Sequence, residues 1–99
     1  MESYLQKAWG DSIEGVTLED VRIAIRETIA MDEEHGAFWV GLVEDNENVL
    51  EATQNLIVSA IFADGTEYRK KFNNWNEIEK LYSIFIEKNF AAVVQLMQE

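Results

Sequence analysis

The chain has 99 residues, and 19 acidic residues against 8 basic ones give it a formal net charge of −11, which repels nucleic acid and anionic membranes and attracts basic partners. Cysteine is absent, which excludes disulfides, thiol nucleophiles and zinc–thiolate sites. No stretch approaches the ~20 apolar residues that span a membrane, and the N-terminus lacks a signal-peptide pattern, so we expect one cytoplasmic domain over residues 1–99.

Two elements are predicted in the first third of the chain. Residues 4–9 have the pattern of a short strand that ends at a glycine. The sequence Thr17-Leu18-Glu19-Asp20 is a capping box, in which the threonine and aspartate side chains bond each other's backbone N–H. Apolar residues then recur at helical spacing, which predicts a helix over about residues 17–31. Its apolar face consists of Leu18, Val21, Ile25 and Ile29.

The middle of the chain predicts a four-stranded antiparallel meander over residues 37–43, 49–53, 56–63 and 66–72. In its first strand Phe38, Val40 and Leu42 point to one side, whereas Trp39 and Val43 point to the other. The third strand is nearly continuous in apolar residues, as expected of a central strand. A hairpin turn at Asp64-Gly65 leads into the fourth strand.

A second helix is predicted over about residues 75–88, with Asn74 as its N-cap and Asn89 as a left-handed terminator. Residues 91–97 are predicted to form a last strand. The order β-α-ββββ-α-β indicates an α+β domain, with a mostly antiparallel sheet of about five to six strands and two helices packed on one face. The predicted core includes Val21, Ile25, Val58, Ala60, Phe62, Leu81 and Phe85.

No catalytic pattern accompanies these elements. Asp32, Glu33, Glu34 and His35 have side chains that ligate metals, but consecutive residues at a helix end diverge, so a solvated loop is favoured. No serine stands in a nucleophile-elbow sequence, and 19 acids make chance carboxylate pairs common. We therefore predict a protein that is not an enzyme and needs no cofactor or metal.

Acidic residues are concentrated in residues 1–68, which hold 15 acids and 3 bases. One group lies on and beside the turn after residue 43, and we expect it to lie near a second group at one end of the sheet. The two groups are Glu44, Asp45, Glu47 and Glu51, and Asp32, Glu33 and Glu34. Two interpretations stay open: a solubilising surface, or a docking site for a basic protein that long-range attraction steers into place.

Two other features bear on binding. Arg69-Lys70-Lys71 is the sole basic cluster; alternation sends Lys70 to the opposite face from its neighbours, and pairing with nearby acids on the sheet is favoured over phosphate binding. If helices cover only one face of the sheet, Trp39 is exposed on the other face and becomes a candidate interaction anchor, because tryptophan is enriched at binding hot spots.

The order of elements resembles that of the immunity proteins of bacterial polymorphic-toxin systems, of the Imm1 type. The resemblance rests on Tyr4-Leu5-Gln6, the helix that starts at Thr17-Leu18-Glu19-Asp20, the strands Phe38-Trp39-Val40-Gly41-Leu42 and Leu56-Ile57-Val58-Ser59-Ala60, and the helix Asn76-Glu77-Ile78-Glu79-Lys80-Leu81. It implies a small, acidic, cytoplasmic protein without enzymatic activity, which protects the producing cell by binding a cognate toxin, often a nuclease, and blocking its active site.

The leading hypothesis is an immunity-type inhibitor that occludes a basic toxin. Its binding residues would be Asp32, Glu33, Glu34, Trp39, Glu44, Asp45, Glu47 and Glu51. The alternatives are another nucleic-acid-mimicking inhibitor, for example a phage-encoded protein, and a small ligand-binding or structural domain whose acidity only aids solubility. The sequence leaves open whether the protein is a monomer or a homodimer.

Overall fold

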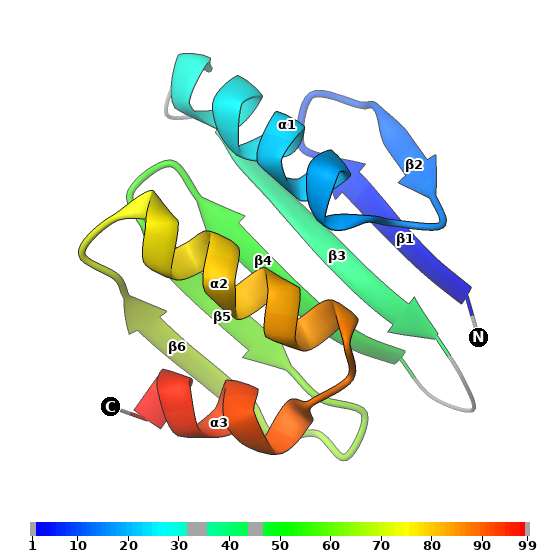
Figure 1. Cartoon of the computed structure of the whole chain (residues 1–99), viewed down its shortest axis with the longest axis vertical. Helices are drawn as coiled ribbons and strands as arrows, with labels where there is room; N and C mark the ends of the chain where they lie inside the picture. The colour runs from blue at the N-terminus through cyan, green and yellow to red at the C-terminus, as the bar shows by residue number, and fades with distance from the viewer. Residues whose placement is uncertain (1, 32–35, 44–46, 99) are drawn as a thin grey trace.

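A computed structural model describes residues 2–31, 36–43 and 47–98, and within them six strands form one antiparallel sheet in the order β2-β1-β3-β4-β5-β6 (Figure 1). The strands are β1 (Glu2–Lys7), β2 (Ser12–Glu14), β3 (Ala37–Val43), β4 (Glu47–Thr53), β5 (Ile57–Ile61) and β6 (Glu67–Lys71). The helices in the same ranges are α1 (Leu18–Ala30), α2 (Trp75–Ile86) and α3 (Phe90–Gln98). This confirms the predicted α+β class and the four-stranded meander, which is β3–β6.

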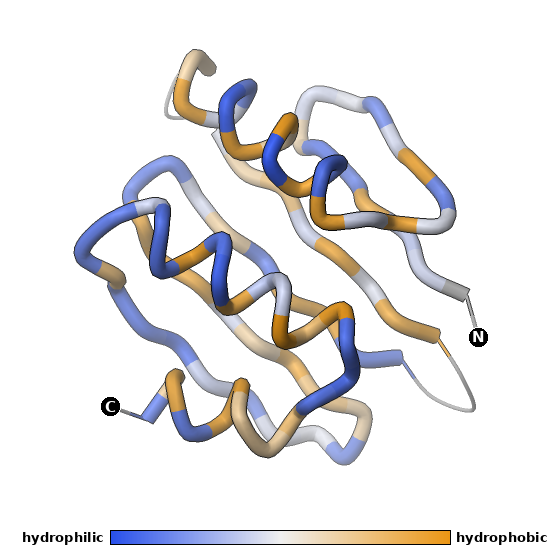
Figure 2. The backbone as a smooth tube through the Cα atoms, in the orientation of Figure 1, coloured by the Kyte–Doolittle hydropathy of each residue, from blue (hydrophilic) through white to orange (hydrophobic). Residues whose placement is uncertain are grey.

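The helices cover one face of the sheet and leave the other face open. Figure 1 shows α1 over β1 and β3, α2 over β4, and α3 beside β6. Figure 2 shows hydrophobic and hydrophilic positions interspersed along the strands and helices. The buried apolar side chains form one core cluster. The fully buried large side chains in this cluster include Leu5, Phe38, Val40, Leu50, Val58, Ile78, Leu81, Tyr82, Phe85 and Val93.

Side chains cap both ends of α1 and the start of α2. At α1 the predicted capping box is present: Thr17 accepts from the Asp20 backbone N–H, and Asp20 Oδ2 accepts from the Thr17 backbone N–H at 2.9 Å. The predicted Asn74 cap accepts from the Glu77 backbone N–H at 2.9 Å. The opposite end of α1 is capped from the β4–β5 turn, where Gln54 Nε2 donates to carbonyl oxygens of the last turn of the helix.

The C-terminal segment is a helix, α3, and not the predicted strand. A strand would have placed Val93, Gln95 and Met97 on the same side, because side chains alternate with a period of two. In the helix Val93 and Met97 lie one turn apart and are buried, whereas Gln95 is exposed. The helical spacing therefore buries the apolar pair without burying the amide between them.

Several local predictions also need correction. Strand β2 was not predicted, because three residues between two glycine turns carry too little pattern. Lys88, and not Asn89, adopts the left-handed conformation after α2, with φ +65°. On α1 the buried residue near the C-terminus is Thr28, while Ile29 is half exposed. Phe62 follows the end of β5 and is only partly buried, with its ring edge-on to Tyr68.

Candidate functional site

The open face of the sheet brings together side chains from five strands. Because antiparallel register aligns opposite residues, one row runs across the sheet from Gln6 through Trp39, Glu51 and Ser59 to Arg69. Directly opposite residues in such a row are close enough for their side chains to interact. The row therefore places an aromatic ring beside a carboxylate in the middle of an uncovered surface.

Trp39 lies on this open face, as the alternation of its strand predicts. It is half-buried between its neighbours, while Phe38 and Val40 on the same strand point into the core. In the described part of the chain neither the indole Nε1 of Trp39 nor the Glu51 carboxylate has a hydrogen-bond or ion-pair partner. An aromatic ring next to an unpaired carboxylate is an arrangement that suits a guanidinium or ammonium group.

A second row on the open face is built around a glycine. Tyr4 lies directly opposite Gly41, and the phenol ring packs over the glycine so closely that a Cβ at position 41 would overlap it. The Tyr4 hydroxyl donates to Glu47 Oε2 at 2.7 Å. Desolvation, followed by this hydrogen bond to Glu47, raises the pKa of Tyr4 to about 12, so the phenol stays protonated at neutral pH.

The structure brings together three of the predicted site residues, Trp39, Glu47 and Glu51, on one face of the sheet. The other five, Asp32, Glu33, Glu34, Glu44 and Asp45, lie outside the described residues. The expected meeting of the two acidic groups at one end of the sheet therefore stays a prediction.

Basic side chains are separated from this region. The open face of β2, β1, β3 and β4 carries no basic residue at its described positions, whereas Arg69 and Lys71 lie on β6 at the far edge. As predicted, Lys70 points the other way, and its Nζ donates to the Leu96 carbonyl at 3.0 Å. The expected ion pairs of this cluster with acids of the sheet are not formed within the described residues.

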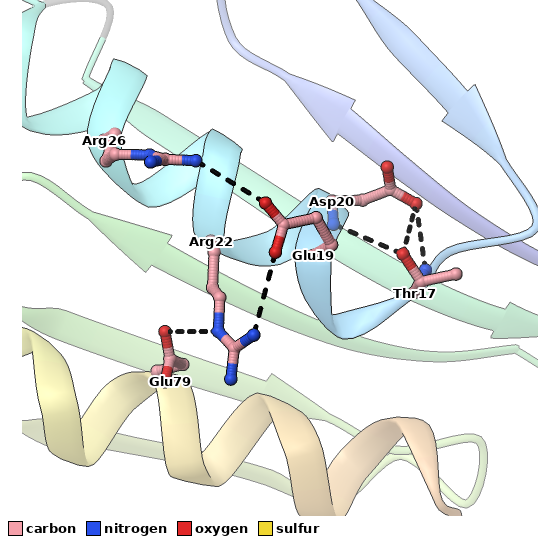
Figure 3. A network of polar contacts seen from close by, with 6 residues as sticks. All are labelled: Thr17, Glu19, Asp20, Arg22, Arg26 and Glu79. Atoms are coloured by element: carbon pink, nitrogen blue, oxygen red, sulfur yellow. Dashed lines mark hydrogen bonds and ion pairs between the residues drawn. The ribbon is translucent and has the colours of Figure 1, made fainter.

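On the helical side, bases of α1 are paired with acids (Figure 3). Arg22 Nε lies 3.2 Å from Glu79 Oε1 of α2, and both Arg22 and Arg26 approach Glu19 at 3.7 Å. The buried Lys7 of β1 is paired with Glu27 of α1. The helical layer therefore neutralises these bases internally, whereas the described acids of the open face form no such ion pair with a described residue.

A pocket of about 520 Å³ opens beside the Trp39 row, at the β1–β2 edge of the sheet. Its lining consists of Ser3, Tyr4, Gln6, Ser12, Ile13, Glu14 and Gly15. Sequence reasoning did not select these residues. The alternation of β1 could have placed Tyr4 and Gln6 on one side, but without β2 no signal connected them to Glu14.

A second, apolar pocket of about 370 Å³ lies between the β5–β6 turn and α3. It is lined by the rings of Phe62, Tyr68 and Phe90 together with Ala91 and Val94. The Asn48 side chain at its edge accepts a hydrogen bond from the Ala63 backbone N–H at 2.9 Å. Asp64 and Tyr68 are the only titratable groups among its lining residues. The pocket could therefore hold an apolar group, but its lining has no arrangement typical of catalysis.

No cluster of three or more His, Cys, Asp or Glu that could hold a metal occurs among the described residues; His35 is not one of these residues. The helices of residues 2–31, 36–43 and 47–98 are too short or too polar to cross a membrane. No family model matches the chain, and comparisons with curated proteins and with solved structures also give no match.

Proposed function

We propose that this protein is a non-enzymatic binding domain that holds a basic protein partner against the open face of its sheet, as an immunity-type inhibitor holds its toxin. The observation that carries the proposal is the row in which Trp39 and Glu51 stand side by side, with no hydrogen-bond or ion-pair partner among the described residues. A half-buried tryptophan in the middle of an uncovered face has the properties of a binding hot spot. The adjoining carboxylates select the charge of the partner.

Charge complementarity identifies the kind of partner. On the described open face of β2, β1, β3 and β4 the charged side chains are acidic, among them Glu14, Glu47 and Glu51. The long-range field of a chain with net charge −11 attracts a basic protein and raises its rate of association. The resemblance to immunity proteins supports a toxin as this partner and occlusion of its active site as the mechanism.

The test starts with capture of a partner from the native host and continues with association kinetics of the purified pair. Replacing Glu47 and Glu51 by Lys should slow association by at least about tenfold at low salt and flatten its salt dependence. The matched control replaces Glu77 and Glu87 by Lys, which makes the same change in net charge on α2. Because those two acids lie at opposite ends of the helix, the effects of the changes on the helix dipole oppose each other.

The wild-type protein and the α2 control should bind alike, and only the open-face variant should be impaired. If the captured partner is not basic, or if the Glu47→Lys, Glu51→Lys variant associates at the wild-type rate, the proposal is wrong. Equal impairment of both variants would also contradict it, because the net charge and not the open face would then determine binding.

A further inference from the structure

The pocket at the β1–β2 edge presents mainly hydrogen-bond acceptors. Tyr4 lies opposite Glu14 and Gln6 lies opposite Ser12, so the four side chains stand on the open face of the sheet. The Gln6 amide uses its Nε2 internally, donating to the carbonyl oxygens of Lys7 at 3.2 Å and Asp11 at 3.3 Å. Its Oε1 therefore remains to accept a hydrogen bond from a ligand.

Tyr4 and Glu14 also present acceptors, whereas the Ser3 and Ser12 hydroxyls can both donate and accept. The Tyr4 hydroxyl gives its proton to Glu47, which leaves the phenol oxygen as an acceptor. The Glu14 carboxylate is exposed and has no ion-pair partner within the described residues. No basic side chain lines the pocket. A ligand that carries positive charge and several donors complements these acceptors.

We propose that this pocket receives an arginine side chain of the basic partner, with the guanidinium bonded to Glu14 and Gln6 Oε1. The inference rests on the proposed function, because it names one contact of the same surface. A guanidinium has five N–H donors in a planar fork and no acceptor, so it can donate to more than one oxygen at once. An ammonium group is a point charge that reaches fewer of them.

The position of the pocket connects it with the rest of the surface. Gln6 lines the pocket and is also the cross-strand neighbour of Trp39. A partner segment whose arginine enters the pocket therefore lies with its neighbouring residues over the indole. This explains how one basic partner engages the tryptophan and the edge of the sheet together.

The inference is tested on the isolated protein with a defined probe. We expect N-acetyl-arginine methylamide to shift the backbone amide NMR signals of Gln6, Ser12 and Glu14 saturably, with the lysine analogue binding more weakly. The neutral citrulline analogue has nearly the same shape and should not shift these signals. Glu14→Gln should weaken arginine binding by about tenfold, as expected for the loss of one charge-assisted hydrogen bond.

The matched control is Glu67→Gln, which removes an exposed acid from the open face at the opposite edge and should leave binding unchanged. Equal shifts with citrulline, shifts that map elsewhere, or full binding by Glu14→Gln would overturn the arginine pocket. The proposed function fails separately: arginine binding without any basic partner contradicts that function alone, and partner binding that depends on Glu51 but not on Glu14 contradicts the pocket alone.

Discussion

The two faces of this sheet are made by alternate residues of the same strands, yet they differ in what their side chains bond to. On the helix-covered face Phe38 stacks on Tyr82 with ring centroids 5.1 Å apart, and the Tyr82 hydroxyl donates to the Leu50 carbonyl. On the open face Trp39 and Glu51 have no hydrogen-bond or ion-pair partners within the described residues. The side chains of the covered face thus bond to one another, whereas the polar groups of Trp39 and Glu51 stay unpaired among the described residues.

The largest loss in the free energy of unfolding is expected for Phe38→Ala on the covered face. Phe38 is fully buried and stacked on Tyr82. Removing its ring should lower the free energy of unfolding by about 3–5 kcal/mol, through lost burial and the cavity left behind. Chemical denaturation followed by circular dichroism measures this loss. A loss below about 1 kcal/mol, the usual range for a surface position, would show that this face is not the core.

The neighbouring substitution, Trp39→Ala, should have the opposite profile. We expect at least about 2 kcal/mol of lost binding free energy for the partner, as at other tryptophan hot spots. The cost in stability should be closer to about 1 kcal/mol, because Trp39 lies on the open face and is only partly buried. Titration of the captured partner and the same denaturation experiment supply both numbers. If the variant loses stability but binds normally, Trp39 belongs to the structure and not to the site.

The Gly41→Ala substitution tests the packing of the Tyr4 ring on Gly41 of the open face. The added Cβ would overlap the Tyr4 ring, so we expect the free energy of unfolding to fall by about 1–2 kcal/mol. Combining it with Tyr4→Ala removes the overlapping ring, and the double variant should be more stable than the sum of the two single changes predicts. Denaturation of the four proteins in this cycle measures the coupling. Strictly additive changes would contradict the close packing of the ring on the glycine.

The smallest effect concerns high pH. In the folded protein the pKa of Tyr4 is raised from 10.0 to about 12, and burial also raises the pKa of Tyr82. Below pH 10 both states keep the phenol proton. Above it the unfolded chain loses the proton first, so the unfolded state binds fewer protons and stability falls as pH rises towards 12. Tyr4→Phe should make this fall shallower in denaturation midpoints measured across that range; an unchanged slope would show that Tyr4 titrates normally.

The periodicity of apolar residues predicts the sheet and helix layers of this fold well, because the strand period of two and the helix period of about 3.6 residues are both clear in these segments. The alternation around Phe38 and Trp39 assigns the two faces of β3, and the capping box at Thr17 marks the start of α1 to within one residue. The C-terminal segment was assigned wrongly because a short apolar run fits both repeats. Its conformation is decided by packing of Val93 and Met97 against the sheet, which no local pattern contains.

The candidate site is only partly accessible to such reasoning. Trp39 and Glu51 could be predicted individually, but their pairing depends on the register between β3 and β4. The pocket at the edge depends on β2, which pairs with β1 through three residues. Register and edge pairing are set by long-range contacts. The sequence therefore shows which residues can lie on the open face, but not which of them become neighbours.

The place of β1 in the sheet also has a consequence for how the chain folds. Strands β3 to β6 are joined by successive hairpins, whereas β1 pairs with β3 across the whole of α1, with Leu5 opposite Val40. Closing that long loop costs more chain entropy than closing a hairpin. We expect the hairpins to assemble early and β1 to dock late. During synthesis Leu5 also leaves the ribosome before β3, the strand on which it packs, has been made. In a nascent chain the apolar side of β1 is therefore exposed to misassociation until β3 has been made.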